Sequence, residues 1–419
     1  MTETRRLHHG WIVLLIGTLV VFASLGLARF GYSMVLPAMQ DGLALDNTQA
    51  GGLATANLIG YLALSALGGA LASRLGPRVV IAAGLFLAGA SMVLTGVVTT
   101  FVGAALWRTV TGVGSGASNV PVMGLMAAWF SARRRGLASG VAVAGSSVAL
   151  IALGPTVPAV LGAYEADGWR VCWWIFGAVT VVVAVLAWAL LRNCPEDVGL
   201  RPVGCVEDPS TPPVTGGTSR LDWGAVYRNA SVWHLGLVYV AFGFSYIIYL
   251  TFFVKFLVAE AGYSDAAAGN LFMLMGWFSL LCGVIWGHVS DVIGRKYALV
   301  IVYLIQAVAF GLFALAGSGV GPTASAILFG LTAWSIPAIM AAACGDVVGP
   351  KLAPAALGFV TLFFGVGQAA GPTVAGAMAD AAGSLQPAML LAAGVAVAGA
   401  VGAGTLRTER SGVAERPAP

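Results

Sequence analysis

The two halves of this chain share a pattern of small residues, offset by about half its length. With an offset of 218 residues, the Ala-Gly pair at 50–51 recurs at 268–269. With an offset of 217 residues, the Gly-Pro-Thr-Val sequence at 154–157 recurs at 371–374. A chain doubled in this way is expected to form two similar bundles, with any central site between them.

Each half consists mainly of apolar segments long enough to cross a membrane, which takes about 20 residues. Hydrophobic residues make up 59% of the chain and charged residues only 9%, whereas a soluble domain carries roughly 25% charged residues. So few charges cannot cover a water-facing surface. We therefore predict an all-α integral membrane protein with twelve transmembrane helices in two pseudo-symmetric six-helix bundles. The predicted spans are 11–39, 48–73, 77–99, 101–128, 136–163, 169–191, 232–258, 267–289, 296–317, 322–344, 354–379 and 386–406.

One long polar stretch, 192–231, separates the two halves. It is rich in Pro, Gly, Ser and Thr, as a linker would be, and its 221–228 segment could form a short interfacial helix. The predicted domains are an N-terminal bundle (1–191), this cytoplasmic linker, a C-terminal bundle (232–406) and a cytoplasmic tail (407–419).

The basic residues predict the orientation in the membrane. Seventeen of the 21 Lys and Arg residues fall in loops or tails on one side of the predicted spans. Positive residues accumulate on the cytoplasmic side, so we expect a multi-pass protein of the cell (inner) membrane with both termini in the cytoplasm. The apolar run from Trp11 is too long for a cleavable signal peptide. The net charge of +4 then reflects the placement of basic residues on one side of the membrane, so we expect no nucleic-acid partner. We also expect the protein to be a monomer.

Several classes of chemistry lack their residues here. The five cysteines have no metal-binding spacing, and no GxxxxGK[ST] loop is present. The glycine-rich 112–118 run is predicted to be a helix-packing surface rather than a phosphate-binding loop. No nucleophile–base pair stands out, so we predict neither an enzyme nor a cofactor.

Three stretches resemble signatures of the major facilitator superfamily. Residues 287–296 look like its G-x-x-x-D-x-x-G-R-K loop. The equivalent stretch at 69–78 is degenerate, with Ser73 in place of the acid and Pro77 in place of the first basic residue. Residues 108–114 resemble its R-x-x-x-G-x-G element. The resemblance covers nearly the whole chain and implies the major facilitator fold.

Further motifs point to a branch of that superfamily. Residues 129–140 resemble the W-F-x-x-R-R-G-L-A-x-G passage of monocarboxylate and oxalate/formate-type porters, and residues 194–202 resemble the R-P-E-D-x-G-L-x-P passage after their sixth helix. This resemblance implies small organic anions as substrates, often moved with a proton. The 154–155 pair matches the antiporter-type G-P-x-x-G-G element only in part, because Pro158 stands where a glycine is expected.

Arg29 is the main candidate for a binding residue. It lies about ten residues, or about 15 Å, from the outer end of the 11–39 span. A guanidinium at that depth costs at least ~2.5 kcal/mol, so it must face a partner or a wet cavity. Its counterpart in the second repeat is Ile247, which indicates function rather than scaffold. The alternative is an arginine that pins its own helix to backbone carbonyls.

Arg108, about seven residues into its span, is the second intramembrane cation. Because it belongs to a superfamily-wide element, a structural or gating role weighs as much as substrate contact. None of the 17 Asp and Glu residues lies in the middle of a predicted span. A cavity with arginine and no carboxylate has a positive potential that attracts anions, and a planar guanidinium matches a carboxylate with two parallel hydrogen bonds.

Polar and aromatic residues on the predicted spans complete the candidate site. The predicted substrate-binding residues are Arg29, Tyr32, Asn57, Tyr61, Arg108, Asn119, Tyr246, Tyr249, Trp277, Trp334 and Gln368. Tyr246 and Tyr249 are expected to share a helix face because they are three residues apart. For each uncharged residue taken alone, helix packing is the alternative explanation.

A second set of charged residues is predicted to act in gating. Asp291, Arg295 and Lys296 lie in the signature loop of the second half, and Arg74 and Arg78 lie in the equivalent loop of the first. An acid in such a loop can pair with a neighbouring helix in one conformation and separate from it in another.

The predicted function is secondary active transport of a small organic anion of the monocarboxylate kind by alternating access. Its partners would be the anionic substrate and the lipid bilayer. No histidine lies in the middle of a span, so a coupled proton would travel on the substrate carboxylate or on a group that the sequence does not identify. One alternative is an exporter of drugs or hydrophobic compounds, although such a protein would be expected to bury a carboxylate. Another is a non-transporting membrane sensor or partner protein.

The predicted topology can be tested by labelling. A cysteine placed within 207–219 of a cysteine-free variant should resist an impermeant thiol reagent applied to intact cells, because the linker is expected on the cytoplasmic side. A cysteine placed at Asp265, in a predicted outer loop, is the matched positive control. Labelling of the 207–219 cysteine from outside would contradict the topology.

Overall fold

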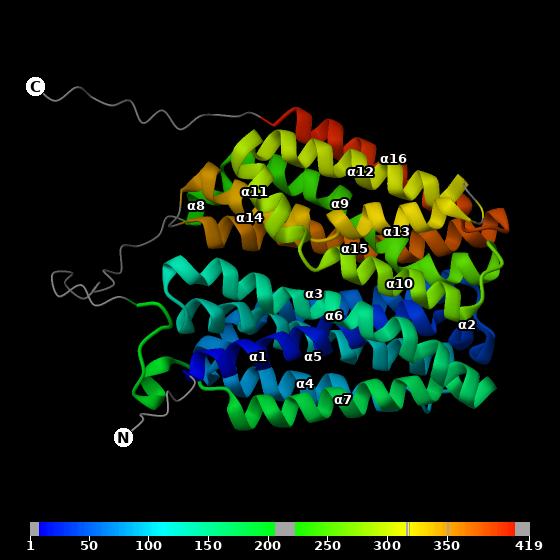
Figure 1. Ribbon diagram of the computed structural model, residues 1–419, viewed down its shortest axis with the longest axis horizontal. Helices are drawn as coiled ribbons and strands as arrows, with labels where there is room; N and C mark the ends of the chain where they lie inside the picture. Colours follow the sequence, from blue (N-terminus) through cyan, green and yellow to red (C-terminus); the bar gives the residue numbers. More distant parts are fainter. Residues whose placement is uncertain (1–7, 206–222, 316, 318, 350–351, 407–419) are drawn as a thin grey trace, which may run out of the picture.

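The structure, a computed structural model, describes residues 8–205, 223–315, 317, 319–349 and 352–406. Within these ranges the regular structure is helical, apart from an isolated bridge between Phe130 and Val203. The helices form two groups that lie side by side with their axes roughly parallel (Figure 1). The predicted all-α fold is confirmed.

The first bundle is built from the helices of the N-terminal half. These are α1 (His9–Val21), η1 (Phe22–Phe30), α2 (Gly31–Leu43), α3 (Asn47–Leu75), α4 (Pro77–Thr95), α5 (Phe101–Trp129), α6 (Ala132–Tyr164), η2 (Glu165–Asp167) and α7 (Gly168–Leu190). The α1, η1 and α2 segments follow one another without a break and cover the predicted 11–39 span.

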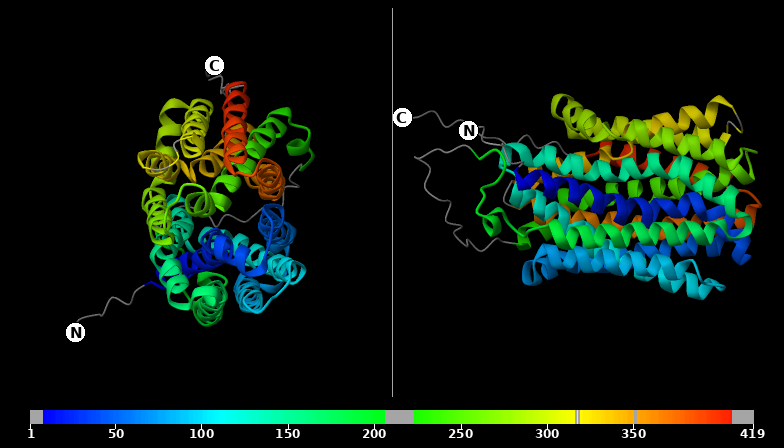
Figure 2. Two further views of the ribbon diagram at one scale, coloured as in Figure 1. Left: turned by 90° about the vertical axis from the view of Figure 1, so that its right-hand side faces the viewer. Right: turned by 60° about the horizontal axis from the view of Figure 1, so that its bottom comes forward.

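The second bundle is built from the helices of the C-terminal half. These are α9 (Ala230–Ala259), α10 (Asp265–Ser279), α11 (Cys282–Ile293), α12 (Arg295–Leu315), α13 (Val320–Thr332), α14 (Ser335–Val348), α15 (Ala353–Ala382) and α16 (Gln386–Gly404). Viewed along the helix axes, the two bundles occupy separate halves of the molecule (Figure 2).

The number of spans can be compared with the twelve that the sequence predicts. Eight helical stretches among the described residues are long and apolar enough to cross a membrane, or up to ten if each of two bent helix pairs is one span. One of these pairs is α10 and α11, bent by 43°. The count of twelve therefore stays a prediction.

The segment between the bundles is described only at its two ends. η3 (Pro195–Val198) follows α7, and α8 (Trp223–Tyr227) lies within the short helix expected at 221–228, of which 221–222 fall outside the described residues. The predicted linker residues 207–219 and the predicted tail 407–419 lie outside the described residues.

The two motif stretches of the porter resemblance meet at the end of the first bundle where α1 begins. The Val203 N–H donates to the Trp129 carbonyl at 2.8 Å, and the Ser131 N–H donates to the Val203 carbonyl at 3.1 Å. The Trp129 indole donates to the Arg192 carbonyl at 3.1 Å. Both stretches therefore belong to one local structure, away from the middle of the membrane.

Glycine sets the distance between α3 and α5. A Cβ on Gly112 would lie 1.9 Å from the Asn57 carbonyl oxygen, and a Cβ on Gly60 would lie 2.1 Å from the Thr109 carbonyl oxygen. Only glycine fits at these two crossings, because any side chain would clash with the opposing backbone. Small residues of this kind let membrane helices approach each other closely. The glycine-rich run at 112–118 is thus a packing surface, as predicted.

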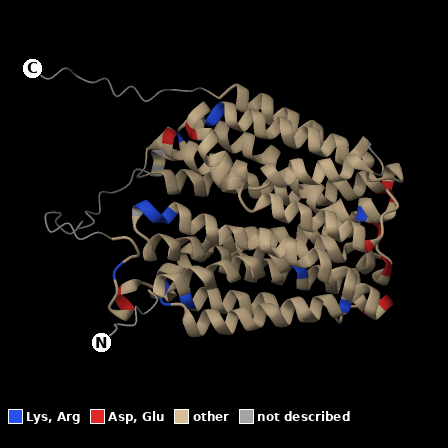
Figure 3. Cartoon of the chain, in the orientation of Figure 1, with Lys and Arg blue, Asp and Glu red and all other residues tan. Residues whose placement is uncertain are grey.

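Charged residues lie mostly at the two ends of the molecule. Lys and Arg gather at the end where α1 begins and α16 finishes, and Asp and Glu lie at both ends (Figure 3). This distribution agrees with the predicted orientation, in which the first of these ends faces the cytoplasm. We call them the basic end and the far end.

The two bundles touch in the half of the molecule toward the far end. A Cβ on Gly51 of α3 would lie 2.1 Å from the Pro372 oxygen of α15, and a Cβ on Gly376 would lie 2.1 Å from the Asn47 oxygen. The second contact joins α6 and α10, where a Cβ on Gly269 would lie 2.2 Å from the Gly154 oxygen.

Hydrogen bonds join the bundles in the same half. The Thr55 hydroxyl of α3 donates to the Ala369 carbonyl at 2.8 Å, and the Ser279 hydroxyl of α10 donates to the Ser147 hydroxyl at 2.8 Å. Nearer the far end, the Lys255 ammonium donates to Asn47.

Toward the basic end the same helix pairs stand apart. A Cβ on Gly69 of α3, Gly140 of α6, Gly287 of α11 or Gly358 of α15 would meet nothing within 4 Å. The described bundles are therefore closed against each other at the far end and open toward the basic end.

Asp380 of α15 caps a helix of the other bundle. Its carboxylate accepts hydrogen bonds from the N–H groups of Asn47 at 2.9 Å and Thr48 at 2.8 Å, and from the Thr48 hydroxyl at 2.5 Å. These are the first N–H groups of α3, which have no partner within the helix. Asp46 caps the next turn through the Gln49 N–H at 2.7 Å. An anion at a helix N-terminus is stabilised by the helix dipole as well, so Asp380 fastens the bundles together.

We expect Asp380→Asn to weaken closure at the far end. A capping carboxylate contributes about 1 kcal/mol, so its loss should raise the population open at that end several-fold. Spin labels at Asp41→Cys and Ala381→Cys in a cysteine-free variant would report the distance between the bundles, and Asp380→Asn should add a longer distance. Glu260→Gln is the matched control, because Glu260 bonds Ser384 and Leu385 within its own bundle. An unchanged distance distribution in Asp380→Asn would contradict the capping role.

Candidate functional site

Arg29 lies in a stretch of π-helix in the middle of the first span. The η1 segment runs over Phe22–Phe30 and contains Arg29 as its one basic residue. π-helical turns are rare, and they occur frequently at functional sites. The sequence predicts a span here but not this widened turn, because π-helix has no residue signature comparable to a proline or a cap.

The Arg29 guanidinium is buried, and part of it lacks a hydrogen-bonding partner. The residue is 9% exposed, and its Nη2 atom has no acceptor among the described residues. Its carbon Cζ lies 4.3 Å from the centroid of the Tyr61 ring, so the cation rests on an aromatic face. A buried N–H left unpaired costs about 1–3 kcal/mol, and more when it is charged. Arg29 therefore holds unused binding capacity for an anion.

Arg108 is buried too, and its Nε atom has no acceptor among the described residues, but its terminal Nη1 atom is occupied. It is 1% exposed and donates from Nη1 to the Ala28 carbonyl at 2.7 Å. Its Cζ lies 4.8 Å from the Tyr32 ring centroid and 4.9 Å from that of Trp173. The side chain thus ties α5 to the π-helical segment next to Arg29. This contact supports the structural alternative for Arg108 and makes it a positioning residue for Arg29.

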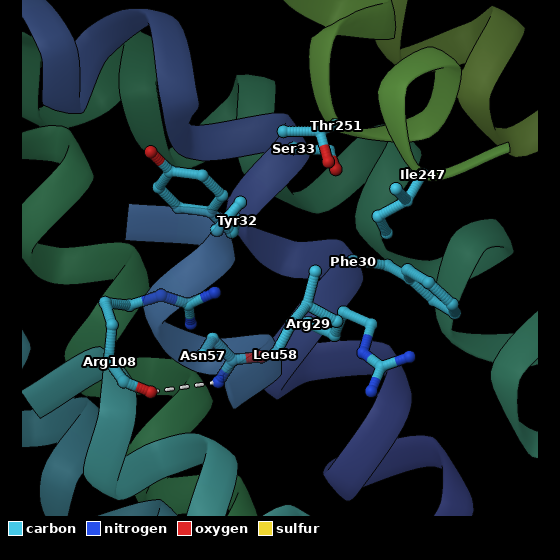
Figure 4. Close-up of a pocket in the computed structure, with 10 residues that line it drawn as sticks. Arg29, Phe30, Tyr32, Ser33, Asn57, Leu58, Arg108, Ile247 and Thr251 are labelled. Carbon is cyan, nitrogen blue, oxygen red and sulfur yellow. Dashed lines mark hydrogen bonds between the residues drawn. The ribbon is translucent and has the colours of Figure 1, made fainter. Parts of the chain in front are cut away.

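A small cavity lies between the two arginines. Its volume, counted as the space that the centre of a water molecule can occupy, is about 10 Å³. That is room for about one water molecule. It is lined by Arg29, Phe30, Tyr32, Ser33, Ala54, Asn57, Leu58, Arg108, Ile247 and Thr251. The Arg108 guanidinium points toward the segment that carries Arg29, whereas the Arg29 guanidinium points away from Arg108 (Figure 4). In this conformation the two bundles are closed against each other on the side of Arg29 that faces the far end.

No carboxylate neutralises either arginine in the described part of the chain. The ion pairs found there involve Arg170 with Asp167, and Arg295 with Asp291 and Asp346. Each of those pairs lies within one bundle. The site therefore carries positive charge in a region of low dielectric constant, where a charge acts over a longer range than in water.

Four other predicted residues gather around Arg29. Asn119 donates to the Tyr61 hydroxyl at 2.9 Å, which places both beside the guanidinium. From the second bundle, Gln368 donates to the Tyr246 hydroxyl. Tyr246 and Gln368 are each 2% exposed, and the Tyr246 hydroxyl lies within hydrogen-bonding range of the Arg29 guanidinium.

Three more predicted residues border this region. Tyr32 donates to the Ala50 carbonyl at 2.7 Å, and Asn57 donates to the Arg108 carbonyl at 3.1 Å, so both brace the first bundle. The Trp334 ring stacks on Phe30 at 5.5 Å between centroids and donates to Ser147 at 3.0 Å. Trp334 thereby connects the second bundle to the residue after Arg29.

Two predicted residues lie elsewhere. Tyr249 does not share a face with Tyr246; its hydroxyl lies 2.7 Å from that of Ser325 inside the second bundle, and its ring packs on Phe310 and Phe329. Trp277 is 56% exposed, which places it on the outer surface of α10 rather than beside Arg29. We exclude both from the proposed site, because neither side chain reaches the guanidinium.

Sequence reasoning missed several neighbours of the arginines. Trp173, Phe30 and Thr251 carry no pattern that sets them apart from other apolar or small residues of the spans. Their role depends on how helices cross, which no local motif encodes. Ile247 was noted only as the repeat counterpart of Arg29, yet it lines the cavity beside it.

The predicted gating residues form separate groups within each bundle. Arg295 bonds Asp291 and, at 3.1 Å, Asp346 of α14. On the first bundle Arg78 donates to the Trp188 carbonyl at 2.7 Å, and Arg74 is exposed. No ion pair among the described residues joins these groups across the bundles, as expected where the bundles stand apart. Their gating role stays a prediction.

Two helical bundles that close around a buried cation at mid-depth define a class of protein, the membrane transporters. The sequence model of the family described as "Uncharacterised MFS-type transporter YbfB" matches residues 21–403. The chain therefore belongs to this family of major facilitator transporters, as the motifs predict. The family consists of transporters rather than enzymes.

Relatives with assigned names cover most of the chain. It is 24% identical to the hexuronate transporter of Bacillus subtilis over 385 residues, covering 88% of this chain and 88% of the relative. It is 26% identical to monocarboxylate transporter 11 of Mus musculus, covering 93% of this chain and 86% of the relative. Among solved structures, it resembles a bacterial homologue of the human lysosomal transporter Spinster in an inward-facing, occupied conformation, with a TM-score of 0.77, 17% identity and coverage of 94% and 96%. That likeness confirms the major facilitator fold.

We expect Asp291→Asn to slow transport and leave equilibrium substrate binding nearly unchanged. The substitution weakens the pair with Arg295, which lies far from Arg29, so it should alter conformational exchange rather than contacts with substrate. Single-turnover transport rates and equilibrium binding would be measured on the same preparation. Asp265→Asn is the control, because Asp265 begins α10 and Asp291 lies near the end of α11, at opposite ends of this bent helix pair. Loss of binding by a folded Asp291→Asn protein would show that the gate assignment is wrong.

Proposed function

We propose that this protein is a secondary active transporter of small organic anions, with monocarboxylates as its substrates. The observation that carries the proposal is the buried Arg29 guanidinium, whose Nη2 atom has no partner, beside a cavity without carboxylates. An anion bound there would satisfy the N–H groups and the charge at once. The names of the relatives support the proposal, because hexuronate and monocarboxylates are organic anions.

The arrangement of the arginines favours an anion with a single negative charge at the site. Arg108 is held by the Ala28 carbonyl and by two aromatic rings, and its unpartnered atom is the inner Nε. Arg29 is therefore the guanidinium that offers an unpartnered terminal nitrogen to the substrate. A carboxylate can accept two parallel hydrogen bonds from it. A dianion would bring a second charge into surroundings of low dielectric constant without a second free cation.

The closed far end and the open basic end support alternating access as the mechanism. In the proposed orientation the basic end faces the cytoplasm, so the structure corresponds to an inward-facing conformation. Release of the Asp380 cap and of the contact between α6 and α10 would open the far end, while the groups around Asp291 and Arg78 would approach each other at the basic end. The substrate site near Arg29 would then face the other side of the membrane.

A coupled proton is proposed to accompany the substrate rather than a fixed residue. The residues that line the cavity include neither histidine nor a carboxylic acid. We further propose that the protein acts as a monomer in the inner membrane with both termini in the cytoplasm, because the proposed site is complete within one chain.

An exporter of hydrophobic compounds is the rival within the same superfamily. Aromatic residues around Arg29 would suit such a substrate, but the buried cation would repel the positively charged members of that class. No observation in the structure favours this function over anion transport.

We expect Arg29→Gln to lower the affinity for a carboxylate about tenfold or more, because a charge-assisted hydrogen bond contributes roughly 1.5–3 kcal/mol. Arg29→Lys should retain part of the affinity, since an ammonium keeps the charge and loses the planar fork. Binding of lactate, pyruvate, benzoate and glucuronate would be measured by calorimetry and by thermal shift on purified protein.

Thermal stability is the control for this experiment. Both variants should unfold near the wild-type temperature, because the cost of burying the wild-type charge offsets what its contacts contribute. Arg170→Gln is the matched arginine control, since Arg170 bonds the Gly96 and Val98 carbonyls at the far end and should not affect carboxylate affinity. Wild-type affinity for a bound carboxylate in folded Arg29→Gln would refute the proposed site.

A further inference from the structure

Two tyrosine hydroxyls, one from each bundle, flank the Arg29 guanidinium, and each is held by a side-chain amide. Tyr61 of α3 accepts a hydrogen bond from Asn119 of α5 at 2.9 Å. Tyr246 of α9 accepts one from Gln368 of α15. A phenol that accepts an amide N–H still has its own hydrogen to donate. Among the described residues we find no acceptor for either phenolic hydrogen.

The position of Tyr61 is fixed by the cation itself. Its ring centroid lies 4.3 Å from the Arg29 Cζ, so the hydroxyl at the edge of that ring is close to the guanidinium. The Asn119 amide fixes the direction in which the hydroxyl can donate. Both residues are partly exposed, as expected for groups that border the open side of the site.

The position of Tyr246 is fixed by an aromatic stack. Its ring lies nearly parallel to Phe242, with centroids 4.7 Å apart and an interplanar angle of 14°. It is also nearly parallel to Phe364, at 5.9 Å and 10°. Because the phenol is stacked on these rings, it has little freedom to turn elsewhere. Its hydroxyl therefore stays within hydrogen-bonding range of the Arg29 guanidinium.

We propose that Tyr61 and Tyr246 donate their phenolic hydrogens to the carboxylate that binds Arg29. A carboxylate has about four lone-pair sites, so it can accept the free guanidinium N–H groups and both phenols. The donors would be arranged around the anion by Asn119 and Gln368, which would act as positioning residues. This inference rests on the proposed function, because it assigns further ligands to the same anion.

The two phenols would contribute to different steps of transport. Arg29 and Tyr61 both belong to the first bundle, whereas Tyr246 belongs to the second. A carboxylate held by Arg29 and Tyr61 alone would be bound to one bundle. The bond from Tyr246 would link the bundles through the anion, and would couple binding to their closure around it.

The first test compares Tyr61→Phe and Tyr246→Phe with Tyr249→Phe by calorimetry. The titrants are lactate, pyruvate, benzoate and glucuronate. Each of the first two substitutions removes one hydrogen bond to a charged group, so affinity for the carboxylate should fall about tenfold. Tyr249→Phe is the matched control on the same helix, because its hydroxyl faces Ser325 inside the bundle, and its affinity should match that of the wild type.

Transport kinetics in proteoliposomes separate the two phenols. Tyr61→Phe should raise KM and leave kcat near wild type, because it removes a contact that the anion makes with the first bundle only. Tyr246→Phe should lower kcat as well, because it removes the link that favours closure. Equal effects of the two substitutions on kcat would overturn the assignment of closure to Tyr246.

Site-specific 3-fluorotyrosine at position 246 distinguishes donation from packing. Fluorine makes the phenol more acidic and a stronger donor with little change in size, so carboxylate affinity should rise if Tyr246 donates to the anion. The measurement should be made at a pH at which the phenol stays protonated. Unchanged or weaker affinity would overturn the donor role, since a packing role is insensitive to phenol acidity.

The outcomes distinguish this inference from the proposed function. If Arg29→Gln abolishes carboxylate binding while Tyr61→Phe and Tyr246→Phe bind like the wild type, the anion site stands and the tyrosine inference is refuted. If the wild-type protein binds none of the four carboxylates, the proposed function is overturned and the inference falls with it.

Discussion

The burial of one unpaired positive charge in the middle of the membrane is the constraint on which the rest of the site depends. A lone guanidinium at that depth is unfavourable by several kcal/mol, and evolution could remove it with a single substitution to the isoleucine found at the repeat-equivalent position. Its surroundings reduce this cost without cancelling the charge. The face of Tyr61 lies 4.3 Å from it, which contributes about 0.5–2 kcal/mol and consumes no N–H group. The arrangement tolerates an empty site and still leaves the hydrogen-bonding capacity for an anion.

The second arginine shows why two similar charges can have different roles. Arg108 donates to Ala28, the residue directly before Arg29, and is enclosed by the rings of Tyr32 and Trp173. Its charge is spread over these contacts inside one bundle, so it fixes the π-helical turn that carries Arg29. The packing of α3 on α5 through Gly60 and Gly112 in turn fixes Asn57, which bonds the Arg108 backbone. The position of the binding arginine thus follows from a chain of contacts within the first bundle.

The sequence predicted the helical membrane fold because that information is local. Apolar runs, the polar linker and the distribution of basic residues each follow from composition in a short window, and the signature loops identified the superfamily. Arg29 was predictable because a charge is conspicuous in an apolar span. The aromatic and amide residues were predictable only in part. Tyr246 and Tyr249 are three residues apart on one helix, yet one faces Arg29 and the other packs inside its own bundle against Phe310. Likewise Trp277 faces outward, because exposure depends on which helix packs beside it rather than on residue type.

The contacts between the bundles explain how a site of this kind can be reached from either side. Near the far end the second bundle supplies Asp380 and Lys255, whose charges meet the start of α3 and the amide of Asn47 in the first bundle. These bonds are made to polar groups that water could satisfy equally well, so their net contribution is small and closure is reversible. Deeper in the membrane the bundles meet through glycine and small hydroxyl residues, which can separate without exposing large apolar surfaces. Within this deeper part of the described interface, Arg29 contributes a charge that water or an anion must satisfy once the bundles part. The free energy of moving between conformations therefore depends on what occupies the space beside Arg29, and the occupant that best matches the charge is an anion.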